Sequence, residues 1–148
     1  MRLISKNRKA FHNYFVEDDF EAGIVLMGSE VKSCYESNVD LSDGYITIND
    51  TTVILKNVFI NRYFNAGINN HVEKRDRFLL LNRHEIKKMV KKISEKGYTL
   101  IPLSIYVHDK TKKIKVSIGV CKGKKQYDKR DDLKKKQIDR DIKREMKR

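Results

Sequence analysis

The 148-residue sequence contains no tryptophan, one proline and two cysteines. Cys34 and Cys121 form no CxxC pair, so we expect two reduced, apolar thiols in place of a disulfide. No stretch approaches the roughly 20 apolar residues that span a bilayer, and residues 1–20 hold no apolar run typical of a signal peptide. We therefore expect a cytoplasmic protein without a membrane partner.

The sequence also lacks the motifs of common enzyme sites. It has neither GxGxxG nor GxxxxGK[ST], and His84-Glu85 is not followed by a second histidine four residues after the first. The acidic residues 17–19 could hold magnesium for a nuclease, but adjacent strand residues point to opposite faces, and an acidic turn is the commoner use. We expect no catalytic residues, no metal and no cofactor.

Negative charge is scarce compared with positive charge. Lys and Arg number 33 against 20 Asp and Glu, a formal net charge of +13, which favours a polyanionic partner such as nucleic acid. Residues 121–148 alone hold 13 basic and 6 acidic residues. Apolar periodicity is concentrated in residues 1–120. We therefore expect a globular body over 1–120 and a basic tail over 121–148.

Two antiparallel hairpins are expected from β-branched and aromatic runs. Residues 45–48 and 53–55 flank a polar connection, and the alternating segments 103–107 and 114–120 flank Asp109-Lys110-Thr111-Lys112.

A third pair is expected from residues 14–16 and 24–26, with the acidic residues 17–19 in the connection. Residues 58–60 are a further strand candidate.

One helix is expected to begin after Asn82, because Asn82 and Glu85 have capping-box spacing. Its apolar stripe comprises Ile86, Met89, Val90 and Ile93, with Gly97 as the expected stop. A shorter helix is expected after Gly28-Ser29, through Val31, Lys32 and Cys34. The fold class is therefore mainly β: a small closed antiparallel barrel of the oligonucleotide-binding type, with two or three short helices and a basic C-terminal tail.

Two segments could bind phosphates of a nucleic acid. Residues 61–77 are interpreted as a long polar loop that carries Arg62, Lys74, Arg75 and Arg77, although a solvated loop without a partner explains the same pattern. In the tail, Tyr127 stands among cations over residues 123–130 and could stack on a base.

Beyond that block the tail has few apolar residues. Leu133, Ile138, Ile142 and Met146 fall roughly on one helical side. We expect this tail to be disordered when free and helical on an anionic surface, with a purely solubilising tail as the alternative.

Eight blocks of the sequence together are similar to one family. In order they are residues 7–10, 14–16, 20–23, 28–33, 79–82, 97–99, 118–120 and the block GKKQYDKR. These blocks resemble those of the SsrA-binding protein family, also called small protein B, and they span almost the whole chain.

The resemblance implies a barrel that binds the tRNA-like domain of transfer-messenger RNA (tmRNA) and brings it to stalled bacterial ribosomes for trans-translation. The family is not enzymatic. The implied partners are tmRNA and the small ribosomal subunit with its rRNA, and we expect a monomer bound to one RNA. A constitutive rRNA-binding ribosomal protein is the alternative, and an RNA-cleaving enzyme using residues 17–19 or His12 is a third reading.

The candidate site residues form two sets. Glu21 and Asn82 match family positions on the RNA-binding face, and residues 123 and 127–130 match the block that reaches the decoding centre. The candidate set in the body is Arg8, Lys9, Tyr14, Glu21, Lys32, Arg75, Arg77 and Asn82. The candidate set in the tail is Gly123, Lys124, Lys125, Tyr127, Asp128, Lys129, Arg130, Lys134, Lys135, Ile142 and Met146.

The sequence also departs from the family pattern near the implied RNA face. Phe11 stands where a basic residue is usual, and Cys34-Tyr35 replace a common Leu-Arg. Val72-Glu73 replace Asp-Pro, and Phe78 replaces a common Lys.

Overall fold

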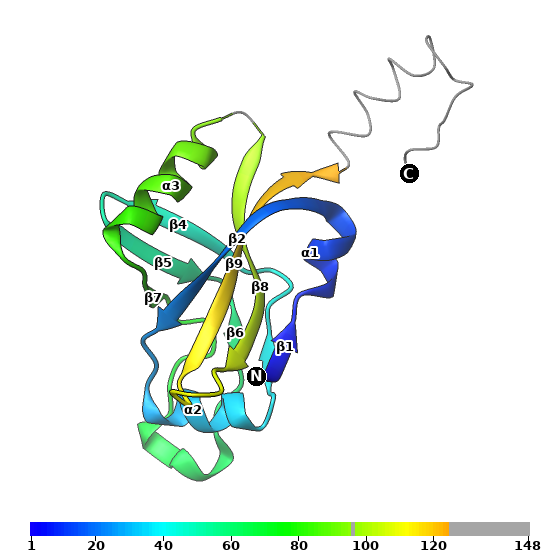
Figure 1. Cartoon of the computed structure of the whole chain (residues 1–148). Coiled ribbons are helices and arrows are strands. Elements are labelled where there is room, and N and C mark those ends of the chain that lie inside the picture. Colours follow the sequence, from blue (N-terminus) through cyan, green and yellow to red (C-terminus); the bar gives the residue numbers. More distant parts are fainter. Residues whose placement is uncertain (96, 125–148) are drawn as a thin grey trace, which may run out of the picture.

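The structure, a computed structural model, describes residues 1–95 and 97–124. Its main element is a seven-stranded antiparallel sheet, accompanied by a two-stranded sheet and short helices (Figure 1). The strands are β1 (Arg2–Lys6), β2 (Tyr14–Ile24), β3 (Val39–Asp40), β4 (Tyr45–Asn49), β5 (Thr52–Lys56), β6 (Phe59–Ile60), β7 (Arg77–Leu80), β8 (Tyr98–Val107) and β9 (Ile114–Gly123). The helices are α1 (Arg8–Asn13), α2 (Gly28–Tyr35), α3 (Arg83–Ile93) and the 3-10 helix η1 (Phe64–Asn69).

The large sheet is curled but not closed. Its strand order is β1-β8-β9-β2-β7-β5-β4, so β1 and β4 are its two edges, and β3 pairs with β6 in the small sheet. β4 lies against β8 without forming a ladder with it. The mainly β class with a few helices is confirmed, whereas the closed barrel is not. No helix in the described part of the chain is long and apolar enough to cross a membrane.

Both of the clearer hairpins are confirmed. β4 pairs with β5 so that Ile46 faces Leu55 across the ladder, and β8 pairs with β9 so that Ile105 faces Val116. β9 continues through Gly123, beyond the expected end of the body at Val120. The strand candidate at 58–60 is also present, as β6.

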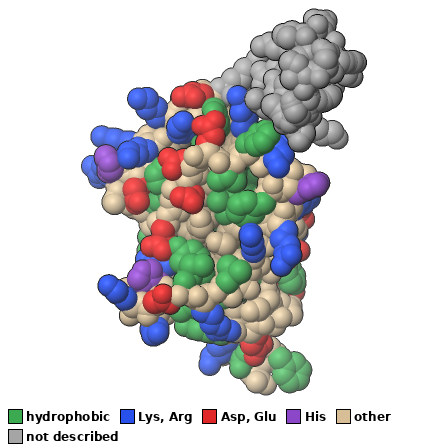
Figure 2. Space-filling view, turned by 45° about the vertical axis from the view of Figure 1, so that its right-hand side comes forward, with side chains coloured by type: hydrophobic (Ala, Val, Ile, Leu, Met, Phe, Trp, Pro, Cys, Tyr) green, Lys and Arg blue, Asp and Glu red, His purple; other side chains and the backbone are tan. Residues whose placement is uncertain are grey.

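The expected third hairpin is wrong, because residues 14–24 form the single strand β2. β2 pairs with β9 along nearly its whole length, with an irregularity between Val16 and Asp18. The acidic residues 17–19 are exposed within the strand and do not turn the chain. The acidic side chains of residues 17–19 are in contact with solvent on the strand. Figure 2 shows acidic and hydrophobic side chains side by side on one face of the molecule.

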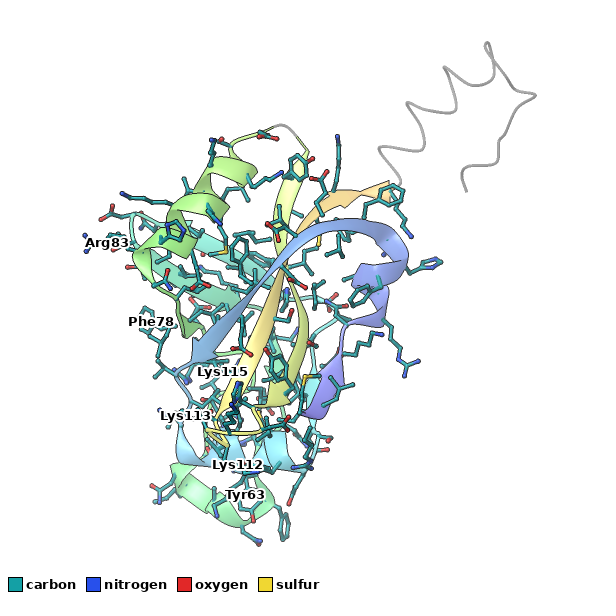
Figure 3. All side chains as sticks on the ribbon, in the orientation of Figure 1. Tyr63, Phe78, Arg83, Lys112, Lys113 and Lys115 are labelled. Atoms are coloured by element: carbon teal, nitrogen blue, oxygen red, sulfur yellow. The ribbon has the colours of Figure 1, made fainter. Side chains whose placement is uncertain are left out.

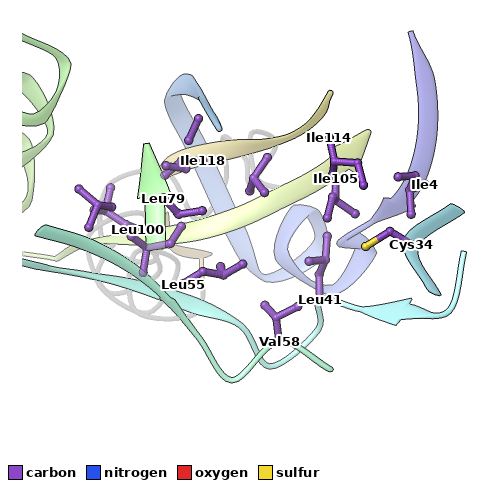
Figure 4. Packing of buried hydrophobic residues seen from close by; sticks show 14 of the residues in the cluster. Ile4, Cys34, Leu41, Leu55, Val58, Leu79, Leu100, Ile105, Ile114 and Ile118 are labelled. Carbon is purple, nitrogen blue, oxygen red and sulfur yellow. The ribbon is translucent and has the colours of Figure 1, made fainter. Parts of the chain in front are cut away.

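The core lies on the inner face of the curled sheet (Figure 4). Leu55, Ile105, Val116 and Ile118 are all fully buried there. A second, smaller cluster forms beneath α1. Its members are Ala10, Ile101, Leu103 and Cys121.

Both cysteines are free and buried, as expected for small apolar residues. Burial raises the pKa of Cys34 to about 12 and that of Cys121 to about 11, so both thiols stay protonated at neutral pH. The described residues contain no group of three or more His, Cys, Asp or Glu that could hold a metal ion.

The helix after Asn82 forms as its capping signal predicts. Asn82 Oδ1 accepts from the Glu85 N–H at 3.0 Å, and Glu85 Oε1 accepts from the Asn82 N–H at 3.2 Å. Ile86 and Met89 are buried, whereas Val90 is exposed, so the apolar stripe is narrower than expected. The second expected helix is α2, which begins at Gly28.

The helix stop is placed too late in the sequence prediction. α3 ends at Ile93 with Ser94 as its C-cap, and Gly97 lies in the turn toward β8 with φ of +91°. Gly97 therefore allows the turn between α3 and β8, because glycine adopts a positive φ without steric strain.

Candidate nucleic-acid interface

Glu21 is the best-defined candidate contact on the outer face of the sheet. Its neighbour Ala22 is buried, so strand alternation directs Glu21 outward. The Tyr106 hydroxyl donates to Glu21 Oε2. Burial, together with this hydrogen bond, raises the pKa of Tyr106, which therefore remains a donor. Oε1 of Glu21 accepts no hydrogen bond within the described chain, so a base amino group or a ribose hydroxyl could donate to it.

Asn82 follows strand β7, which pairs with β2, the strand that carries Glu21. The β2–β7 ladder ends at the pair Gly23 and Leu80, and Glu21 and Asn82 each lie two residues beyond that pair on their own segment. Asn82 uses its side-chain oxygen to cap α3, which leaves the amide NH₂ group as a donor. Glu21 and Asn82 thus offer one carboxylate acceptor and one amide donor next to the β2–β7 ladder.

An apolar strip continues from these residues along β7. Phe78 is 53% exposed and Leu80 is 59% exposed, and the Val25 N–H donates to the Phe78 carbonyl at 3.0 Å. Exposed apolar residues next to one another on a small protein indicate a contact surface.

Three lysines extend the same face toward α2. Figure 3 shows Lys115, Lys113 and Lys112 in a row, with Phe78 to one side at β7. These lysines also line an open pocket of about 410 Å³ with Gly23 and Leu80. Cations beside apolar groups can neutralise phosphates while bases contact the strip.

These lysines are absent from the site residues predicted from the sequence. Lys115 alternates with the core residues Ile114 and Val116, and this pattern could have placed it on the outer face. Leu80 and Tyr106 were missed as well. Their role depends on which strands neighbour β2, and residue spacing does not give that order.

Arg77 corrects the predicted body set. Its side chain is fully buried, and its guanidinium donates to Glu30 Oε2 at 2.7 Å, to the Val58 carbonyl at 2.8 Å and to the Glu73 carbonyl at 2.9 Å. The prediction of an exposed phosphate contact at Arg77 is therefore wrong. The reason is strand alternation, since β7 begins at Arg77 and directs both Arg77 and Leu79 inward.

Arg75 shares the same carboxylate but is partly exposed. Its Nη2 donates to Glu30 Oε1 at 2.6 Å, and 30% of its side chain remains accessible. Burial alone would raise the pKa of Glu30, but hydrogen bonds from Arg75 and the Met27 N–H and the charge of Arg77 hold it below its usual range. Glu30 is therefore ionised at neutral pH. We call Glu30, Arg75 and Arg77 the buried ion cluster.

The remaining predicted residues of the body do not join Glu21. Arg8 and Lys9 are exposed on α1, and Lys9 pairs with Asp43 at 3.5 Å. Tyr14 is half-buried against the cluster beneath α1. Lys32 lies on α2, with its Nζ 5.7 Å from the centroid of the Tyr63 ring.

Two predicted tail residues lie within the described chain. Gly123 pairs with Tyr14 in the β2–β9 ladder. Lys124 Nζ donates to the Phe11 carbonyl at 3.3 Å and lies 5.2 Å from the centroid of the Phe15 ring. The other predicted tail residues lie outside the described residues: Lys125, Tyr127, Asp128, Lys129, Arg130, Lys134, Lys135, Ile142 and Met146.

The departures from the family pattern are scattered over the body. Cys34 is part of the core, and Tyr35 stacks with Arg2 at 5.4 Å. Glu73 accepts from Arg77 through its carbonyl oxygen. Phe11 and Val72 are exposed, and Phe78 lies on the apolar strip.

Comparison with known proteins identifies the family. The model of the SmpB protein family matches residues 4–148. The SsrA-binding protein of Treponema denticola is 46% identical over 99% of this chain and 94% of its own, and that of Clostridium tetani is 47% identical over 99% and 92%. A solved structure described as tmRNA-SmpB in the bacterial ribosome has a TM-score of 0.69 and 37% identity over 81% of this chain and 83% of its own. The chain therefore belongs to the SmpB protein family.

Proposed function

We propose that the protein binds the tRNA-like domain of tmRNA and delivers it to stalled ribosomes, where trans-translation tags the incomplete peptide. The observation that carries this proposal is the match to SsrA-binding proteins over nearly the full chain, together with the structural likeness to a tmRNA-bound relative. The protein acts by binding, in the cytoplasm, as a monomer with one RNA. The constitutive ribosomal alternative is not favoured, because the relatives are named for SsrA binding.

The outer face around Glu21 supplies the chemistry for this binding. A folded RNA offers phosphates and unstacked bases, and RNA is recognised mainly through such shape and edge contacts. Glu21 and Asn82 provide one acceptor and one donor, the apolar strip of Phe78 and Leu80 can contact bases, and Lys115 can neutralise a phosphate. The curled sheet supports a barrel of the oligonucleotide-binding type as its frame.

The tail is assigned to the ribosome in this proposal. Residues 125–148 hold 11 basic and 6 acidic residues, which suits the anionic channel that messenger RNA normally fills. Tail folding would then require an empty channel, because messenger RNA in place excludes it. Helix content of the tail peptide should rise on adding a polyanion, and an unchanged circular dichroism spectrum would contradict induced folding.

Binding of the tRNA-like RNA to Glu21→Gln tests the proposed face. Hydrogen bonds to charged groups contribute about 1.5–3 kcal/mol, so the Kd should rise at least about tenfold. Glu95→Gln is the matched control, since Glu95 is exposed beyond α3 and should leave the Kd unchanged. Equal affinities for wild type and Glu21→Gln would refute the assignment of this face.

A further inference from the structure

Residues 63–70, here called the closed loop, have a conformation fixed by their own hydrogen bonds. Asn70 Oδ1 accepts from the Tyr63 N–H at 2.8 Å, and Asn70 Nδ2 donates to the Tyr63 carbonyl at 2.7 Å. Gly67 has φ of +60° and ψ of −127°, a region that side-chain-bearing residues rarely adopt. The loop is thus shaped before any partner arrives, which lowers the entropy cost of binding.

Helix α2 anchors both flanks of the closed loop. Ser33 Oγ donates to the Asn61 carbonyl at 2.6 Å, and Ser29 Oγ lies 2.7 Å from His71 Nδ1. His71 Nε2 donates to the Ile60 carbonyl at 2.8 Å, because a carbonyl oxygen can only accept. Together with the buried ion cluster, these bonds fix the loop against α2 at the lower end of the molecule in Figure 1.

The closed loop exposes two large apolar side chains to solvent. Phe64 is 94% exposed and Ile68 is 99% exposed. A loop that is rigid and yet leaves such side chains uncovered is typical of a contact element.

A hollow of about 570 Å³ separates the closed loop from α2. Tyr63 and Lys32 line it, as do Asn65 and Asn69. The Lys32 ammonium lies 5.7 Å from the centroid of the Tyr63 ring. The side-chain amides of Asn65 and Asn69 are exposed and make no hydrogen bond within the described part of the chain.

We propose that this hollow binds one unpaired nucleotide of the partner RNA. Tyr63 offers a ring for stacking, the two amides can donate to and accept from a base edge, and Lys32 can neutralise the adjacent phosphate. An unpaired nucleotide exposes the face of its base, the edge of its base and its phosphate, whereas a duplex exposes mainly its backbone. The proposal rests on RNA binding by the protein and adds a second contact, at α2, to the one at Glu21.

The test uses the full-length protein and a single-stranded RNA decamer of mixed A and U. Tyr63→Leu should raise the Kd for this strand about tenfold, since stacking contributes about 1–3 kcal/mol per base. The double variant Asn65→Ala/Asn69→Ala should weaken binding severalfold, and it changes only exposed side chains, so it keeps the test valid if Tyr63→Leu unfolds. Tyr45→Leu is the matched control, because Tyr45 is an exposed tyrosine on β4.

An NMR measurement and a comparison of affinities distinguish the possible results. The side-chain amide signals of Asn65 and Asn69 should shift in NMR spectra with the single strand and not with the same sequence as a duplex. Equal weakening for strand and duplex, or wild-type affinity of both hollow variants for the strand, would overturn the proposal. If tRNA-like RNA still binds in a Glu21-dependent manner, only this inference fails; if that RNA does not bind wild type, the proposed function fails instead.

Discussion

The body is held together differently on its α2 side and on its α1 side. On the α2 side the buried residues include an ion cluster, with Glu30 ionised between Arg75 and Arg77. Beneath α1 the buried cluster consists of Ala10, Ile101, Leu103 and Cys121. Apolar packing tolerates small shifts in geometry, whereas a buried ion cluster requires defined positions for each partner. The α2 side therefore fixes the position of the closed loop, and the α1 side mainly buries apolar surface.

Arg77→Met should give the largest loss of stability. It leaves Glu30 with a buried charge that Arg75 alone pairs, and breaking a buried pair costs about 3–5 kcal/mol. Urea unfolding monitored by circular dichroism measures the change. Arg75→Met is the control and should cost less, because 30% of the Arg75 side chain is already in water. Equal losses in the two variants would contradict the ranking.

Gly119→Ala tests the packing beneath α1 with a smaller expected effect. A Cβ at this position would lie 2.7 Å from Leu103 Cδ1, and overpacking costs about 1–3 kcal/mol. Gly28→Ala is the comparison, since no atom lies within 4 Å of a Cβ there. If both substitutions leave the urea midpoint unchanged, the α1 side is looser than its packing indicates.

A fall in pH should lower the stability of the fold through the α2 side, with the third-largest expected effect. The pKa of Glu30 is lower in the folded chain than its usual value, so its contribution is complete above the unfolded pKa. That contribution is lost as the pH falls through the folded pKa. Thermal unfolding from pH 7 to pH 3 should show a steeper loss for wild type than for Arg77→Met. Parallel curves would show that Glu30 does not drive the acid response.

The smallest effect is expected for an ion pair on the surface of α1. Lys9 pairs with Asp43 at 3.5 Å, with 58% of each side chain accessible. Lys9→Ala should change the free energy of unfolding by less than about 1 kcal/mol, because solvent screens exposed pairs. A loss as large as that of Arg77→Met would remove the contrast between the two sides.

Local sequence signals predicted the elements that depend on local chemistry. The Asn82–Glu85 capping box and the two clearer hairpins need only neighbouring residues, and all three are present. β2 was misjudged because its acidic run resembles a turn, while its real determinant is pairing with β9, about 100 residues away. Arg77 was predicted to be exposed because the start of β7 was not foreseen; strand alternation directs Arg77 inward, to Glu30, which is 47 residues away in the sequence.

The candidate site shows the same limit. Family resemblance indicated Glu21 and Asn82, whereas the donor that fixes Glu21 comes from Tyr106, 85 residues further along the chain. The lysine row at 112, 113 and 115 becomes a site feature only once β9 lies beside β2. Which strands are neighbours therefore decides which charged residues share a face.

The separation of RNA binding from ribosome action is tested most directly by a chain truncated after Lys124, which keeps β9 whole. Selective binding of tmRNA over an unrelated structured RNA of equal length and peptide tagging on stalled ribosomes should be measured in parallel with the full chain. We predict that selective binding persists and that tagging disappears. Loss of both activities together, or tagging at the wild-type level, would contradict the account.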